Sequence, residues 1–147
     1  MLCTVKHLHG EPAKYKPTHI KHPCVLWVNK SSDNWSSLHD LTYFLNEEYK
    51  FRFNKKVNHK SWDVVKDMSP PVSLKSRGIT LFPQAMPDKY KHKEDAVIAY
   101  RRYFIGEKQH LANWGRRDPP DWFLKATDPD YSEPQVISHA QTILALP

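Results

Sequence analysis

The fold is decided by the stretch SSDNWSSLHDLTYFLNEEYKFRF, residues 31–53. Ser31 and Ser32 are good helix N-caps, and Asp33 follows in what would be the first turn. Apolar residues and a threonine then recur at spacings of three and four, as Trp35, Leu38, Leu41, Thr42, Leu45 and Tyr49. This spacing predicts a helix to about Phe53 that buries one face in a core. The other face would meet water and carries Asp40, Glu47, Glu48, Lys50 and Arg52.

Shorter helices are predicted on both sides of this stretch. One runs from Ser61 through Met68 and stops before Pro70-Pro71, because proline cannot continue a helix. Another spans Glu94 to Trp114, with Gly106 as a weak point and a buried stripe of Ala96, Val97, Tyr100, Phe104, Leu111 and Trp114. A last helix begins near Ser132. The short apolar run 24–28 fits either a buried strand or the first turn of a helix.

Proline-rich segments separate these helices. Residues 1–24 are interpreted as an N-terminal arm, because Gly10, Pro12, Pro17 and Pro23 interrupt most of their length. Residues 69–93 contain four prolines and Gly78, and they are expected to form a long loop pinned by a few apolar residues. Residues 118–147 form an acidic C-terminal segment. The pattern predicts a mainly α fold: a compact single-domain helical bundle over residues 1–147 with long Pro-rich loops.

Composition places the chain among globular proteins. It has 147 residues, 39% of them hydrophobic and 12% aromatic, which is enough bulky material for a core. No apolar run approaches the roughly 18 residues needed to cross a bilayer, and the N-terminal residues lack a signal-peptide pattern. The two cysteines, Cys3 and Cys24, are expected to be reduced thiols. We therefore expect a cytoplasmic protein with no membrane partner.

The charge distribution suggests a polyanionic partner. Residues 1–93 hold 16 Lys and Arg against 8 Asp and Glu, whereas residues 118–147 hold one against five. A basic body favours binding to nucleic acid, because each phosphate neutralised by Lys or Arg releases counterions. A basic surface that only keeps the protein soluble is the alternative. Cations alternate in the sequence with aromatic residues, whose rings could stack on bases or could form part of the core. The predicted phosphate contacts are Lys50, Arg52, Lys55, Lys56, Arg101, Arg102, Arg116 and Arg117.

Few residues suggest catalysis. Glu107 lies late on the helix predicted for residues 94–114, close in sequence to cations, where a carboxylate could serve as a base or form a plain salt bridge. Six potential metal ligands fall in the first 24 residues, but their spacing matches no standard zinc site: Cys3, His7, His9, His19, His22 and Cys24. Packing or hydrogen bonding of these side chains is the alternative to a metal. With four glycines and no nucleotide-binding loop, no cofactor and no metal are predicted.

Several strings of the sequence resemble a largely uncharacterised family of small phage and bacterial proteins. They are YKPTHIKHPCVLWV (residues 15–28), EYKFRFNK (48–55), PQAMPDKY (83–90) and AYRRYF (99–104), followed by Glu107-Lys108 and by Trp114 to Phe123. That family is distantly similar to the phage pyrimidine-dimer DNA glycosylases of the endonuclease V type. The resemblance implies a compact helical protein that flips a nucleotide out of the duplex. Members carry an earlier helix with Asp-x-His and a glutamate, so the resemblance assigns no residue of this chain to the role of the catalytic amine or of that glutamate.

Two functions are expected from these observations. The first is a phage-type DNA-binding or DNA-processing protein, acting on damaged or modified pyrimidines if it is an enzyme. The second is a non-enzymatic viral factor that binds and inhibits a host protein, with the segment from Asp118 to Glu133 and the Pro-rich loop as contact surfaces. Binding to DNA that weakens steeply with salt would favour the first function over the second.

Overall fold

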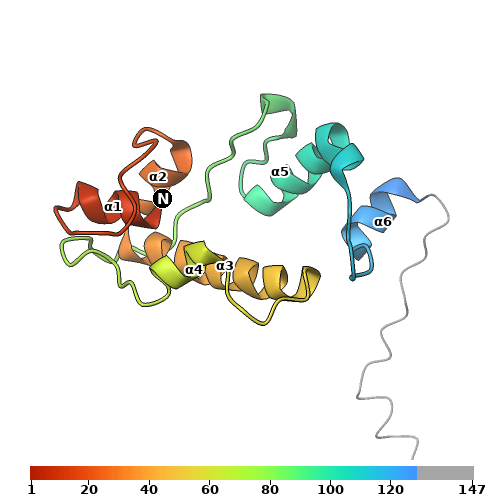
Figure 1. Cartoon of the computed structure of the whole chain (residues 1–147). Coiled ribbons are helices and arrows are strands. Elements are labelled where there is room, and N and C mark those ends of the chain that lie inside the picture. Colours follow the sequence, from red (N-terminus) through yellow and green to blue (C-terminus); the bar gives the residue numbers. More distant parts are fainter. Residues whose placement is uncertain (129–147) are drawn as a thin grey trace, which may run out of the picture. The chain divides into compact units, whose positions relative to one another are not determined.

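The computed structural model describes residues 1–128, and the mainly α prediction is confirmed for them (Figure 1). No strand forms within these residues. The helices are α1 (Leu2–Leu8), α2 (Pro23–Val28), α3 (Ser32–Arg52), α4 (Lys60–Val65), α5 (Ala96–Tyr103) and α6 (Asp121–Thr127). Shorter helical turns are the 3-10 turns Asp88–Tyr90 and Gln109–Leu111 and a π-helical turn, Phe104–Lys108. The helix predicted from Ser132 lies outside the described residues.

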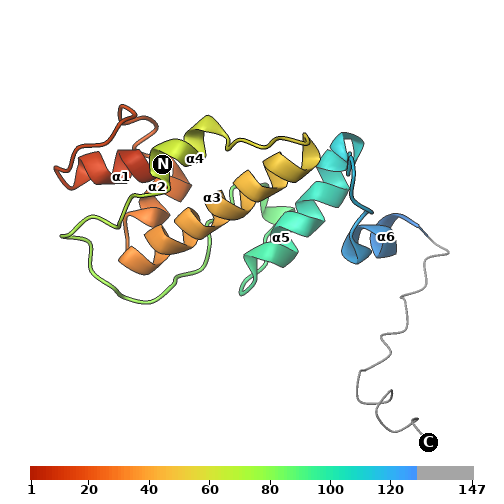
Figure 2. The ribbon, with the colours of Figure 1, turned by 60° about the horizontal axis from the view of Figure 1, so that its bottom comes forward.

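The chain divides into two compact units after Tyr103, and each is described by itself. In the first unit, α1, α2 and α4 pack around α3 (Figure 2). The core lies against the first half of α3, where Trp35 is 1% and Leu38 is 7% exposed. Helices α1 and α2 cover these side chains with Leu2, Cys3, Val5, Val25, Trp27 and Val28, all of which are buried.

Local interactions explain why α3 begins and ends where it does. The Ser31 hydroxyl accepts a hydrogen bond from the Asn34 backbone N–H (3.1 Å), which is an N-cap. Two ion pairs strengthen the last turns, Glu47 with Lys50 (2.6 Å) and Glu48 with Arg52 (3.2 Å). Beyond the helix Asn54 takes a left-handed backbone conformation with φ of 51°, which turns the chain away from the helix axis. The predicted boundaries of 31–53 are therefore correct to within a residue.

The predicted buried stripe of α3 is wrong in its second half. Leu41 is 44% exposed and Leu45 is 60% exposed, although both fit the apolar spacing. The covered face of the helix runs instead through Leu38 and Asn46, which are 7% and 2% exposed, and Leu41 and Leu45 lie outside it. Phe44, which is 66% exposed, adds to this uncovered apolar surface.

The N-terminal residues also differ from the prediction. Part of the expected arm is helix α1, and its residues Leu2 to Val5 are buried in the core. Proline and glycine interrupt the segment only from Gly10 onward, so the first turns were free to fold. The run 24–28 belongs to helix α2 rather than to a strand, because Pro23 occupies the first turn and the His22 side chain accepts a hydrogen bond from Cys24 N–H.

Residues 69–93 form a loop as predicted, with a short 3-10 helical turn at Asp88–Tyr90. The helix predicted over residues 94–114 is less regular than expected. α5 ends at Tyr103, and the π-helical turn that follows contains Gly106, the residue singled out as a weak point. The predicted stripe is partly wrong here too, since Val97 is 55% and Leu111 is 61% exposed. α4 also ends earlier than predicted, at Val65.

The second unit is held together by aromatic residues. The rings of Phe104, Trp114, Trp122 and Phe123 form a mutual cluster in which ring centroids lie 5.1–6.3 Å apart. Edge-to-face contacts of this kind stabilise beyond the apolar area that they bury. This cluster packs α6 against the π-helical turn and fixes the path of the chain between them.

Candidate nucleic-acid interface

Four of the predicted phosphate contacts gather at the C-terminal end of α3. Lys50 and Arg52 lie in its last turn and pair with Glu47 and Glu48 on the same helix. Lys55 and Lys56 follow the left-handed turn at Asn54, and both are exposed. Neither lysine forms an ion pair with any residue in 1–128. These two lysines are therefore the cations of this surface whose charge is left for a ligand.

Aromatic rings lie beside these lysines. Phe53 is 59% exposed, and its ring centroid is 5.5 Å from that of Tyr49. The Tyr49 ring contacts His59 edge-on at 5.1 Å. The Phe53 ring thus contacts Tyr49, which in turn contacts His59, and more than half of the Phe53 surface meets solvent. The resulting surface, which we call the α3 end surface, consists of Phe53, Lys55 and Lys56 with these supporting rings.

The other four predicted cations lie on two other segments of the chain. Arg101 and Arg102 are exposed on the last turn of α5, within the first unit. Arg116 and Arg117 follow Trp114 and Gly115 in the second unit, and both are exposed. The eight predicted residues therefore lie on three segments of the chain, and four of them share the end of α3 and the turn after it.

Glu107 lies in the π-helical turn of the second unit and is exposed. It lines an open hollow of about 520 Å³ together with Ile105, Gly106, Gln109 and His110. His110 is the one other side chain of this hollow that could take part in proton transfer. The predicted catalytic role of Glu107 stays a prediction.

The six potential metal ligands do not converge on one point. Within residues 1–128 no three His, Cys, Asp or Glu side chains are grouped as a metal would require. His22 caps α2, His7 bonds to the Tyr15 carbonyl (3.0 Å), and His9 contacts Ser73 (2.6 Å) and Asn29 (2.8 Å). Burial raises the pKa of the Cys24 thiol, which keeps it protonated and weakens it as a ligand.

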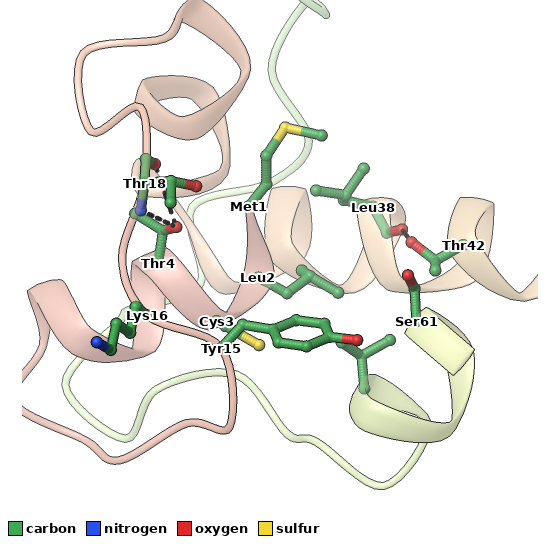
Figure 3. Close-up of a pocket in the computed structure, with 11 residues that line it drawn as sticks. Met1, Leu2, Cys3, Thr4, Tyr15, Lys16, Thr18, Leu38, Thr42 and Ser61 are labelled. Atoms are coloured by element: carbon green, nitrogen blue, oxygen red, sulfur yellow. Dashed lines mark hydrogen bonds between the residues drawn. The ribbon is translucent and has the colours of Figure 1, made fainter. Parts of the chain in front are cut away.

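An apolar pocket of about 510 Å³ opens beside α1, α3 and α4 (Figure 3). Its floor is made by Leu2, Cys3, Leu38 and Val65, all buried. Thr4 exchanges two hydrogen bonds with the backbone of Thr18 (3.2 and 3.3 Å), which holds the segment carrying Tyr15 and Lys16 over one side. Neither Glu107 nor any predicted phosphate contact lines this pocket, whereas Cys3, one of the potential metal ligands, does.

A cationic pocket that sequence reasoning missed lies at the opposite end of α3. It measures about 430 Å³, and its lining includes Lys30, Lys75 and Arg77 with His9, Ser73 and Thr80. The alternation of cations around Ser76 was visible in the sequence as Lys75-Ser76-Arg77-Gly78. Its proximity to Lys30, 45 residues earlier in the chain, was not visible, because only the tertiary fold brings the loop back to the start of α3.

Comparison with protein-family models, with curated proteins and with solved structures finds no match to this chain. None of the helices within residues 1–128 is long and apolar enough to cross a membrane.

Proposed function

We propose that this protein binds DNA through the α3 end surface and prefers DNA with unpaired bases. The observation that carries the proposal is the exposed Phe53 ring beside Lys55 and Lys56. Lysine ammonium groups bind phosphates without regard to sequence, and an exposed ring stacks on any base whose face is free. A paired and stacked base offers no such face, which is why unpaired DNA is the preferred form.

The ion pairs at the end of α3 indicate which cations contribute most to phosphate binding. Lys50 and Arg52 are partly neutralised by Glu47 and Glu48, so their contribution to phosphate binding is smaller than the sequence suggests. Exposed pairs of this kind contribute little to stability, and a phosphate can compete with the carboxylate for the cation. We therefore assign Lys55 and Lys56 as principal contacts, with Lys50 and Arg52 as secondary ones.

DNA processing is a further step of the same proposal. The resemblance to the family related to phage DNA glycosylases supports it. Glu107 is the carboxylate proposed for such chemistry. A strand-cleavage assay on oligonucleotides with and without pyrimidine dimers tests this step, and the Glu107→Gln variant should lose any cleavage seen.

The binding proposal is tested by fluorescence anisotropy with labelled single-stranded and duplex DNA over a salt series. Replacing Lys55 and Lys56 by Ala removes two phosphate contacts, so the slope of log K against log[salt] should fall in magnitude by about 1.4 for a single strand. The Lys14→Ala, Lys21→Ala double variant removes the same charge from exposed positions outside the surface and should keep the slope.

The ring is tested separately. Phe53→Ala should weaken single-strand binding by about 1–3 kcal/mol, the usual contribution of one stacked base. Val57→Ala is the matched control, since Val57 is 67% exposed nearby in sequence but has no ring to stack. Wild-type protein that fails to bind DNA at low salt would refute the proposal and favour a factor that binds a host protein.

A further inference from the structure

We propose that the cationic pocket at the start of α3 binds a phosphate group carried by a small molecule or by the end of a nucleic-acid strand. Its cations are Lys30, Lys75 and Arg77, and no Asp or Glu lines the pocket of about 430 Å³. Like charges repel, so three cations around one hollow without an acidic partner favour a bound anion. This inference does not rest on the α3 end surface.

The three cations are not used elsewhere in the described part of the chain. Lys30, Lys75 and Arg77 make no ion pair with any residue from 1 to 128. Two carboxylates bond to the same loop, but neither pairs with one of these three cations: Asp33 also accepts from the Ser76 hydroxyl (3.0 Å), and Glu11 pairs with Lys6. Asp33 accepts hydrogen bonds from Arg77 N–H and Gly78 N–H (both 2.9 Å), and Glu11 accepts one from Val72 N–H (2.7 Å).

The walls of the pocket are held in place before any ligand arrives. Ser32 N–H donates to the Lys75 carbonyl (3.0 Å), which fixes Lys75 against the start of α3. The Asn34 side-chain N–H donates to Thr80 Oγ1 (2.9 Å), and the Asn34 side-chain carbonyl oxygen accepts from Thr80 N–H (2.9 Å). Ligand binding therefore requires ordering of only the long cationic side chains, which keeps its entropic cost low.

On the far side, His9 connects the pocket to α2. Its ring contacts Ser73 Oγ (2.6 Å) and Asn29 Oδ1 (2.8 Å), and all three residues line the pocket. The loop is thus anchored at Ser73 by His9 and at Thr80 by Asn34. Lys75 and Arg77 lie between these two anchors.

The available groups suit a phosphate better than a carboxylate. The Arg77 guanidinium can bind two phosphate oxygens at once, and two lysines supply further charge. Thr80 Oγ1 accepts from Asn34, which leaves its hydroxyl proton to donate to an anion. The positive end of the 21-residue helix α3 lies beside Ser31, another lining residue. A phosphate monoester carries close to two negative charges at pH 7, which three cations can neutralise.

The volume indicates that more than inorganic phosphate can enter. Pockets for small ligands usually measure about 300–1,000 Å³, so a nucleotide-sized molecule can place its phosphate here. The pocket is also separate from the α3 end surface, because a helix of this length spans about 30 Å. The two surfaces can therefore be disabled one at a time.

The test is a titration of the ¹⁵N-labelled full chain at low salt, followed by NMR. The probes are inorganic phosphate, adenosine monophosphate, and a short oligothymidylate with and without a 5′-phosphate. Phosphate and adenosine monophosphate should shift the amide signals of Lys30, Ser31 and residues 75–80. Replacing Lys30, Lys75 and Arg77 by Ala should weaken binding at least about tenfold, since each charged hydrogen bond contributes on that order.

A charge-matched control separates a site from general basicity. The Lys14→Ala, Lys21→Ala, Lys93→Ala variant loses three exposed positive charges outside the pocket and should bind within about threefold of wild type. Equal losses in both triple variants, or no amide shift with about 10 mM phosphate, would overturn the proposal.

The oligonucleotides distinguish the source of the phosphate. A pocket for strand ends should bind the 5′-phosphorylated strand more tightly than the unphosphorylated one, and the difference should vanish in the pocket variant. A pocket for small molecules should bind adenosine monophosphate but should bind the two strands equally. Either result supports the phosphate site. The Lys55→Ala, Lys56→Ala variant should keep phosphate binding in the pocket. A result that contradicts DNA binding by the α3 end surface can therefore be told apart from one that contradicts phosphate binding by the pocket.

Discussion

Asn34→Ala tests the contact that fixes the long loop to the core. Asn34 is fully buried, and its side chain donates to the Trp27 carbonyl (2.8 Å) and to Thr80 Oγ1 (2.9 Å) and accepts from Thr80 N–H (2.9 Å). Three hydrogen bonds at a net 0.5–1.5 kcal/mol each would contribute about 1.5–4.5 kcal/mol in total. The variant therefore removes the main link between α3 and Thr80.

The expected loss lies toward the lower end of that range. The Trp27 carbonyl keeps a hydrogen bond from Lys30 N–H (3.1 Å), so the substitution does not leave it without a partner. Thr80 is exposed, so water can replace Asn34 at its backbone and hydroxyl groups. We therefore expect a loss of about 2 kcal/mol in the free energy of unfolding.

Urea unfolding followed by tryptophan fluorescence measures this loss, and limited trypsin digestion locates it. Cleavage after Lys75 and Arg77 should accelerate, because the variant loosens the loop at Thr80, where the hydrogen bond from Trp27 Nε1–H to the Thr80 carbonyl (3.0 Å) remains. Asp40→Ala, at an exposed position of the same helix, should change stability by less than about 0.5 kcal/mol. An Asn34→Ala protein as stable as the Asp40→Ala protein, with unchanged digestion, would refute the reasoning.

Two further predictions concern pH and metal. Hydrogen bonds from Arg77 N–H, the Ser76 hydroxyl and Gly78 N–H hold the pKa of Asp33 below its usual value of 3.8. Ionised Asp33 therefore stabilises the fold fully at pH values above 3.8, and this stabilisation is lost as the pH falls through the lowered pKa of the folded state. Urea midpoints from pH 6 to pH 2 should therefore fall less steeply for Asp33→Asn than for wild type, and parallel curves would contradict the assignment. Because His7, His9 and His22 each bond within the protein, a chelator should leave the melting temperature unchanged in a thermal scan, and a clear decrease would show a bound metal.

The sequence by itself predicted the helical class and the position of α3. Ser31 and Asp33 supply local N-terminal signals, and the alternation of apolar and charged residues over 31–53 is typical of a helix that packs on one side. These signals act within a few residues, so they can be interpreted without knowing the rest of the fold. The prolines likewise predicted the loop over residues 69–93.

The tertiary structure decided which parts of those helices are buried and which cations lie together. Leu41 and Leu45 match the apolar spacing but remain exposed, because the covered face of α3 runs through Leu38 and Asn46 rather than through them. Leu2 and Val5 belong to the core, which no periodicity over so short a segment could establish. Lys30 meets Lys75 and Arg77 only because Asn34 and Asp33 bond to a loop more than 40 residues later. Burial and proximity depend on long-range contacts, and these are set by the packing of the whole unit rather than by local sequence.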